Sequence, residues 1–149
     1  MLFRSHLSSL SEAVHSLVAR RAGLDAEADD YLHRAIAIDL HDSRGNRPDG
    51  LHMATQGGLW QAVVLGAGGV RADGAVLQLD PHPAPGWERL RFSLTHRGTP
   101  LTVTVTPDEV TVEAHVGSTR VALPGFEGVV AAGSPVQLTR SGSGWRAAA

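Results

Sequence analysis

The chain has 149 residues, of which 42% are apolar and 5% aromatic, with 17 glycines, eight prolines and a formal net charge of −2. This composition provides a core for one or two small domains and excludes a fibrous or fully disordered protein. No apolar run reaches the roughly 18 residues that a membrane span needs, and no signal-peptide pattern begins the chain. A basic stripe for a phosphate backbone is also missing. We therefore expect a cytoplasmic protein that binds neither membrane nor nucleic acid.

Two reactive residue types are absent from the sequence. There is no cysteine, which excludes disulfides, thiolate metal sites and cysteine nucleophiles. All 13 basic residues are arginines, so no lysine is available for Schiff-base chemistry. None of the eight histidines has the i, i+4 or His-Glu-x-x-His spacing of a metal site. We predict no metal site.

Residues 7–65 have the periodicity of helices. Ser9 and Glu12 have the spacing of a capping box, and Gly23 is placed to end that helix in a left-handed conformation. A second helix begins by Asp25 and forms an antiparallel hairpin with the first. The residues expected to face inward are Leu10, Val14, Leu17 and Val18, with Arg21 at the edge, and then Ala28, Tyr31, Leu32, Ala35, Ile36 and Leu40.

A third helix is predicted from about Leu51 to Leu65, after a polar linker over residues 41–50. It is apolar nearly all round, which predicts burial on several sides and places Trp60 in the core. Gly57 and Gly58 in its interior would each cost about 1 kcal/mol relative to alanine. Another helix or a ligand is therefore expected to approach the backbone closely here.

From about Val70 onward the sequence has the pattern of strands and turns. Residues 75–80, 89–96, 101–106 and 110–115 alternate apolar and polar side chains, and 120–123, 128–132 and 136–139 supply further strands. These segments predict a small antiparallel β-sandwich. The Ser/Gly/Ala-rich tail over residues 141–149 is expected to fray.

Several motifs resemble glycoside hydrolase family 65, which contains the inverting phosphorylases of trehalose, maltose and kojibiose. The most specific is the stretch from Asp49 to Val64, DGLHMATQGGLWQAVV, which is followed by GAGGVR from Gly66 to Arg71. The serines at 8, 9 and 11 with His15 resemble the serine-rich helix entry of the family, and Trp87 to Phe92 resembles the start of its C-terminal domain. The resemblance covers roughly residues 8–138.

This resemblance implies a segregated α+β architecture. Residues 1–68 would be the last helices of an (α/α)6 catalytic barrel, residues 69–140 a C-terminal β-sandwich, and residues 141–149 a flexible tail. The general acid of the family is a glutamate on an earlier barrel segment, and no residue here matches it, so no catalytic residue is assigned. Ala67 and Leu51 depart from the family pattern and leave the substrate subtype open.

The resemblance also implies part of a phosphate pocket, formed by Ser8, Ser9 and His52, with Thr55 one turn further on. The physical chemistry is compatible, because a helix N-terminus favours an anion and an imidazole, neutral or charged, can donate to a phosphate oxygen. Two alternatives stay open: Ser9 with Glu12 is also a capping box, and His52 has the position of a structural histidine. The Glu12 carboxylate would compete for the same N-terminus.

Other candidate sites have simpler interpretations. The glycines over residues 66–69 follow a helix and precede a strand, which is the reverse order of a nucleotide-binding loop, and indicate a domain junction. Asp39, Asp42 and Asp49 lie in or near the linker, where capping and solubility are the expected roles. Trp87 is expected to anchor the sandwich, with stacking on a sugar as the alternative.

Together these features predict a fragment of an inverting phosphorylase or hydrolase for α-linked glucose disaccharides, with phosphate as co-substrate and no cofactor. It would be inactive alone and would form a homodimer or require a missing N-terminal part. Two further functions stay open: a non-catalytic carbohydrate-binding or interaction module, and a subunit that completes a barrel in trans.

Overall fold

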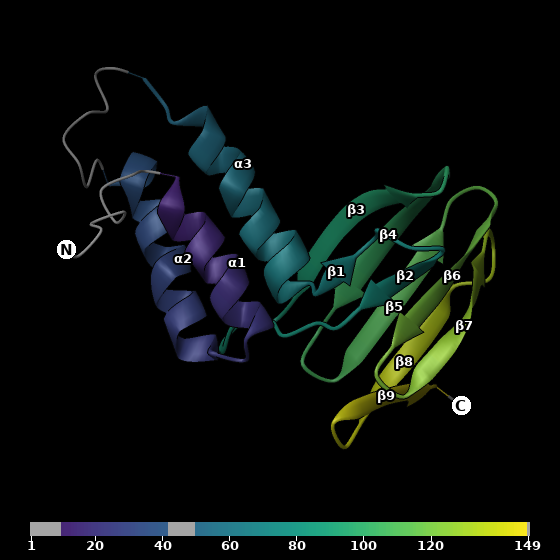
Figure 1. Cartoon of the computed structure of the whole chain (residues 1–149). Helices are drawn as coiled ribbons and strands as arrows, with labels where there is room; N and C mark the ends of the chain where they lie inside the picture. Colours follow the sequence, from purple (N-terminus) through teal and green to yellow (C-terminus); the bar gives the residue numbers. More distant parts are fainter. Residues whose placement is uncertain (1–9, 42–49, 149) are drawn as a thin grey trace. The chain divides into compact units, whose positions relative to one another are not determined.

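A computed structural model describes residues 10–41 and 50–148 of the chain (Figure 1). The predicted phosphate ligands Ser8 and Ser9, and the linker aspartates Asp42 and Asp49, lie outside the described residues. The chain divides into two compact units between Ala67 and Gly68. The first unit is helical and the second consists of β-strands, so the segregated mixture of helix and sheet is as the sequence predicts.

The described residues of the helical unit, 10–41 and 50–67, form three α-helices and a short π-helix. These are α1 (Ser11–Arg21), α2 (Asp25–Leu40), α3 (Met53–Gln61) and the π-helix η3 (Ala62–Ala67), which continues α3. Gly23 ends α1 as predicted: its φ is +74°, and the next amide, of Leu24, donates to the Ala19 carbonyl at 3.0 Å. The turn over residues 22–24 then returns the chain so that α2 packs against α1.

The buried face of α1 is not the predicted one. Leu10, just before the helix, is 48% exposed, and Val14 and Val18 are 49% and 58% exposed. The buried residues of α1 are instead mostly small or polar: Glu12, Ala13, Ser16, Ala19 and Arg20. Small side chains let the helices approach closely, and two of the polar ones bond to α2: the Ser16 hydroxyl donates to the Ala28 carbonyl at 2.8 Å, and Arg20 pairs with Asp25 and Asp29.

On α2 the inward stripe is partly as predicted. Ala28, Leu32 and Ala35 are buried, whereas Ile36 and Leu40 are exposed. Their places in the interior are taken by Ile38 and by the carboxylate of Asp39, which is 8% exposed. The C-terminal end of α2 therefore places a charged group in the interior of the unit and aliphatic groups on its surface.

The two glycines of α3 have different surroundings. A Cβ on Gly58 would lie 2.9 Å from the Cβ of Ala13, so the predicted close approach of another helix is confirmed there. At Gly57 there is nothing within 4 Å among the described residues, so none of the described helices approaches it, and the alternative of a ligand stays a prediction. Trp60 is 52% exposed and Met53 75% exposed, so α3 is not buried on all sides.

The second unit contains two sheets. One has the order β1-β2-β6-β7 and the other β3-β4-β5-β8-β9. The strands of the first are β1 (Val70–Arg71), β2 (Val76–Leu79), β6 (Ser118–Leu123) and β7 (Phe126–Ala131); those of the second are β3 (Leu90–His96), β4 (Thr99–Val105), β5 (Glu109–Ala114), β8 (Val136–Ser141) and β9 (Gly144–Ala147). Neighbouring strands are antiparallel except β2 and β6, which are parallel, so the expected all-antiparallel arrangement is wrong at this pair.

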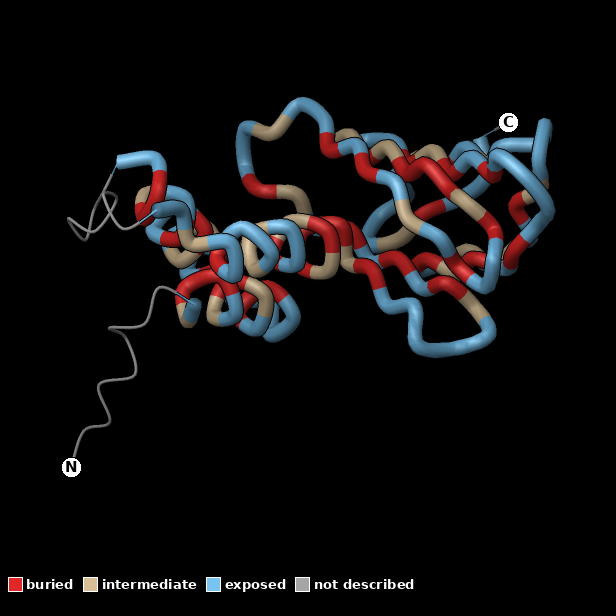
Figure 2. Tube along the Cα trace, turned by 90° about the horizontal axis from the view of Figure 1, so that it is seen from above, coloured by how far each residue is buried: buried red, intermediate tan, exposed pale blue. Residues whose placement is uncertain are grey.

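The core of this unit consists of alternate side chains of the strands, as the period of two predicts. Buried and exposed positions alternate along most of the strands (Figure 2). Leu77, Leu101, Val110, Val112, Val121 and Val130 are all fully buried. His96 at the end of β3 is also buried and connects the sheets: its Nδ1 lies 2.7 Å from Thr119 Oγ1 on β6, and its Nε2 lies 3.1 Å from the Gly74 carbonyl.

The C-terminal residues are more ordered than the sequence predicts. Instead of fraying, residues 144–147 form β9 and pair with β8. Trp145 is the physical reason, because its ring is buried and its amide donates to the Pro124 carbonyl at 2.7 Å. The guanidinium of Arg140 lies 4.4 Å from the centre of the same ring. Burial of the Trp145 ring therefore favours an ordered strand in a segment that otherwise consists mostly of small residues.

Candidate functional site

His52 lies at the N-terminus of α3, where the family resemblance places a phosphate ligand. Its φ and ψ of −81° and 80° are not helical, and the helix begins at the next residue. Gly50, two residues earlier, has a φ of +108°, a conformation that side chains disfavour. The His52 carbonyl accepts from the Gln56 amide at 3.1 Å and forms the first turn. The histidine is therefore fixed at the point where the chain enters the helix.

Asp39 of α2 holds His52 through two different groups. Its Oδ2 accepts from the His52 backbone amide at 3.1 Å, and its Oδ1 lies 2.6 Å from the ring Nδ1. The side-chain amide of Gln56 donates to Oδ2 at 2.7 Å. Both carboxylate oxygens are thus engaged by groups at the start of α3, and the residue joins the end of one helix to the beginning of another.

The pKa of Asp39 lies below its ordinary value of 3.8. The largest cause is the hydrogen bond from the His52 side chain, followed by the bond from Gln56, and both stabilise the carboxylate. Burial acts in the opposite direction but is outweighed. Asp39 is therefore ionised at neutral pH, so the 2.6 Å contact is a charge-assisted bond in which Nδ1–H of His52 donates.

Sequence reasoning missed Asp39, for which capping or solubility was the expected role. A signal was available, because Asp39 continues the stripe of Leu32 and Ala35 on the inner face of α2. A carboxylate in phase with buried apolar residues needs a partner. What the sequence did not contain was the identity of that partner, 13 residues further along the chain.

The other predicted ligand within the described residues, Thr55, is fully buried in the first turn of α3. Of the four residues in the predicted phosphate pocket, the structure thus describes His52 and Thr55, and only His52 has exposed side-chain surface, 21%.

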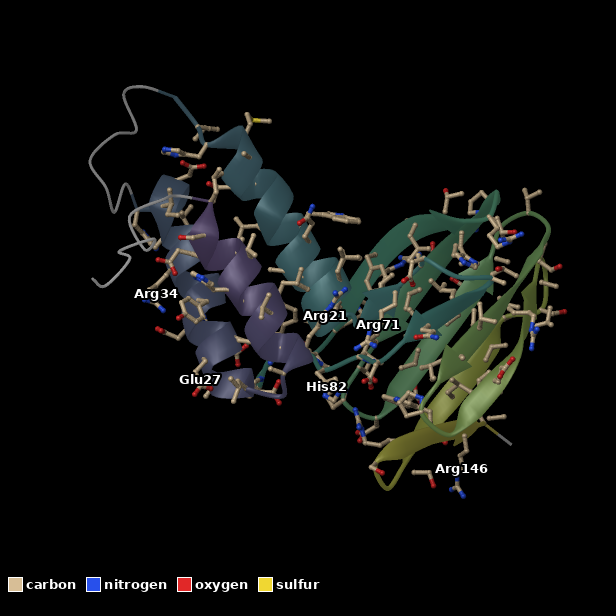
Figure 3. The ribbon with its side chains drawn as sticks, in the orientation of Figure 1. Arg21, Glu27, Arg34, Arg71, His82 and Arg146 are labelled. Atoms are coloured by element: carbon tan, nitrogen blue, oxygen red, sulfur yellow. The ribbon has the colours of Figure 1, made fainter. Side chains whose placement is uncertain are left out.

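The capping-box partner Glu12 is buried in α1, with its carboxylate 3.7 Å from the Arg34 guanidinium. Arg34 projects from α2 and lies over the ring of Tyr31 (Figure 3).

An open depression of about 360 Å³ lies beside the Asp39 network. Its wall is mostly aliphatic, with two polar residues of the network; the lining residues are Ile36, Asp39, Leu40, Leu51, Gln56 and Leu59. A polar network next to an apolar depression is the usual composition of a ligand site.

The orientation of α1 relative to α2 is fixed by a second charged group. Arg20 is buried, and its guanidinium binds the carboxylates of Asp25, at 3.0 Å, and Asp29. Both carboxylates neutralise the buried guanidinium. The ion pairs of Arg20 with Asp25 and Asp29 therefore stabilise the packing of α1 on α2.

Residues 10–41 and 50–148 lack two kinds of feature. No cluster of three or more His, Asp or Glu side chains suited to a metal ion occurs there. No helix in the same ranges is long and apolar enough to cross a membrane.

Comparison with known proteins identifies both units. Residues 3–61 match the central catalytic domain of glycosyl hydrolase family 65, and residues 70–125 match the C-terminal domain of the same family. The chain is 40% identical over 107 residues to a kojibiose phosphorylase of Halothermothrix orenii, an alignment that covers 72% of this chain and 14% of the relative. It is 39% identical over 101 residues to an α,α-trehalose phosphorylase of Geobacillus stearothermophilus, with 68% and 13% covered.

A solved structure assigned as a kojibiose phosphorylase from the human microbiome has a similar fold. It superposes with a TM-score of 0.83 at 28% identity and covers 92% of this chain and 20% of its own. In the sequence comparisons, the chain spans about one seventh of the length of the curated relatives it matches. Since consecutive segments match the catalytic and C-terminal domains of one family, the chain belongs to glycosyl hydrolase family 65.

Proposed function

We propose that this chain is the C-terminal portion of an inverting glycoside phosphorylase for α-linked glucose disaccharides and that it contributes His52 to the phosphate pocket. The observation that carries the proposal is the placement of His52 at the entry to α3, held by the buried carboxylate of Asp39. A histidine held in this way at a helix N-terminus is suited to bind an oxyanion.

The reaction explains why such a pocket is needed. A phosphate oxygen attacks the anomeric carbon as the glycosidic bond breaks, the leaving glucose oxygen takes a proton from a general acid, and β-glucose 1-phosphate forms with inversion. Phosphate replaces the water that a hydrolase would activate, so the pocket requires hydrogen-bond donors rather than a catalytic base. The family resemblance places the general acid on a segment outside these 149 residues.

The relatives support the substrate class. Kojibiose and α,α-trehalose phosphorylases are similar to this chain at nearly the same identity, 40% and 39%. Such similarity does not separate one disaccharide from the other, and the class common to both is the one proposed here.

The exposed surface of the helices supports a barrel fragment. Large apolar side chains are exposed on all three helices, including Val14, Val18, Leu40 and Trp60. Exposed apolar surface of this extent marks a face that packs against another element. We propose that further helices of an (α/α)6 barrel cover it and that the two sheets form the β-sandwich of the family. Those helices could also belong to a separate polypeptide, and a larger protein that co-purifies with the 15.7 kDa chain would indicate this arrangement.

The test is an assay of the protein purified from its native cells. With inorganic phosphate it is expected to release β-glucose 1-phosphate from at least one of kojibiose, trehalose and maltose. His52→Asn should raise the KM for phosphate, whereas His33→Asn, at an exposed position on α2, should not. Hydrolysis without any need for phosphate, or an unchanged KM in the His52 variant, would contradict the proposal. The 149-residue chain by itself is expected to give no product.

A carbohydrate-binding module is the second candidate, favoured by one observation in the sheet unit. The proline-rich segment over residues 81–87 borders an open depression of about 390 Å³ lined by His82, Trp87 and Arg140, among others. An indole beside polar side chains is a common arrangement for binding a sugar ring. Titration of the chain with glucose disaccharides, followed at the Trp87 indole, would show saturable shifts if this function were the correct one.

A further inference from the structure

Asp39 accepts two hydrogen bonds from His52, one from its backbone and one from its ring. The backbone amide and the ring Nδ1 both donate to this one carboxylate, at 3.1 and 2.6 Å. Two bonds from one residue to one acceptor group fix the ring relative to its own backbone. The direction in which the opposite ring nitrogen, Nε2, points is thereby fixed as well.

The same geometry decides which nitrogen can meet an anion. Because Nδ1 donates to Asp39, any bond from the ring to a phosphate oxygen has to come from Nε2. In the neutral ring with its proton on Nδ1, Nε2 is an acceptor and cannot donate to that oxygen. Only the doubly protonated ring carries a proton at both nitrogens, and it also supplies a positive charge.

We propose that Asp39 is a positioning residue for phosphate: it holds His52 with Nδ1 protonated and directs Nε2 of the imidazolium to a phosphate oxygen. This inference rests on the proposed function of His52. It goes further by naming the residue that orients the ligand, the nitrogen that binds and the protonation state in which it does so. Neither the family matches nor the sequence pattern assigns such a role to Asp39.

Gln56 is part of the same hydrogen-bond network as Asp39 and His52. Its amide donates to Asp39 Oδ2 at 2.7 Å, on the oxygen that also accepts the His52 backbone amide. It therefore restrains the carboxylate without contacting the ring. Gln56→Leu should weaken phosphate binding in the same direction as Asp39→Asn but by less, because the charge and the bond to Nδ1 remain.

The first test needs no substitution. In long-range ¹H–¹⁵N spectra of the chain at a pH where His52 is neutral, the ring is expected to show the pattern of the Nδ1–H tautomer. On addition of inorganic phosphate the ring should shift toward the doubly protonated pattern. A neutral ring with its proton on Nε2 would overturn the proposal, whatever the activity of the protein, because Nδ1 would then not donate to Asp39.

The second test separates positioning from general damage. In the active protein, Asp39→Asn is expected to raise the KM for phosphate about tenfold, with a much smaller change in kcat, as loss of one charge-assisted bond predicts. The matched control is Asp30→Asn, the same change on the same helix at a carboxylate that is 67% exposed and paired with Arg34. It should leave both constants unchanged.

The outcomes distinguish this inference from the function on which it rests. If His52→Asn raises the KM for phosphate but Asp39→Asn does not, phosphate binds at His52 and Asp39 has no positioning role. If neither variant changes it while the Nδ1–H tautomer is observed, the proposed function fails and Asp39 is only structural. Equal losses of kcat and thermal stability in the Asp39 and Asp30 variants would also overturn the positioning role.

Discussion

The two units of this chain differ in how many of their large apolar side chains are buried. The sheet unit buries most of its aliphatic side chains, and among its described residues, 68–148, only Val116 and Val129 are large, apolar and exposed. The helical unit exposes nine such residues in its described part, and its interior contains the charged residues Glu12, Arg20 and Asp39 beside small and aliphatic ones. The difference teaches that the sheets enclose most of their large apolar side chains, whereas the helices combine a small apolar core that contains charged groups with large apolar side chains on the surface, which further protein can cover. The candidate site lies in the unit with the incomplete surface.

The largest expected effect comes from replacing a leucine by alanine once in each unit. The comparison tests whether large apolar side chains are buried in the sheet unit and exposed in the helical unit. Leu77→Ala, at a fully buried position on β2, is expected to lower the free energy of unfolding by about 2–5 kcal/mol. Leu40→Ala, at a position of α2 that is 64% exposed, should change it by no more than about 0.5 kcal/mol. Urea denaturation followed by circular dichroism measures both. Equal losses would mean that the helical surface is not exposed as described.

The link between the two sheets provides the next test. His96→Leu removes the bonds to Thr119 Oγ1 and the Gly74 carbonyl and leaves both groups without their partner, at a cost of about 3 kcal/mol. The control is His82→Leu, because His82 is 53% exposed and bonds only to the exposed Asp80 among the described contacts. Thermal unfolding of the two variants should differ clearly, and a His96 variant as stable as the control would refute the link.

Within the helical unit, the two glycines of α3 predict effects of opposite sign. Gly58→Ala should destabilise by about 1–2 kcal/mol, because the new methyl group would meet the Cβ of Ala13 at 2.9 Å. Gly57→Ala should stabilise by up to about 1 kcal/mol, because its Cβ position is open and alanine favours the helix. The melting temperatures of the two variants test the packing of α3 on α1. Shifts of the same sign would show that this packing is wrong.

The smallest expected effect is the acid sensitivity of the Asp39 network. The pKa of Asp39 is lower in the folded chain than its ordinary value of 3.8, so the unfolded chain binds the proton more readily. The stabilising contribution is therefore complete above that value and is lost as the pH falls below it through the folded pKa. The difference in melting temperature between the native chain and Asp39→Asn should therefore become smaller as the pH is lowered from about 6 to below 3.8. Curves that stay equally far apart would contradict the pKa shift.

The sequence predicted the features that depend on local chemistry. Gly23 ends α1 because a left-handed residue is needed there, and alternation along the strands identifies the sheet core. It also predicted the close approach of a helix at Gly58 but not the face of α1 that packs there: Ala13 and other small residues are buried, and the apolar stripe with Val14 faces outward. Asp39 was missed for a related reason, because its partner His52 becomes a neighbour only after the helices pack.

The most direct test of the central proposal is the intact mass of the polypeptide that carries this sequence in its native cell extract. A species several-fold heavier than 15.7 kDa, active with phosphate on an α-linked glucose disaccharide, is the expected result. It would supply the protein that we propose covers the exposed apolar residues of the helices, and the segment on which the family resemblance places the general acid. A species of 15.7 kDa with neither a co-purifying partner nor phosphate binding at His52 would contradict the phosphorylase proposal.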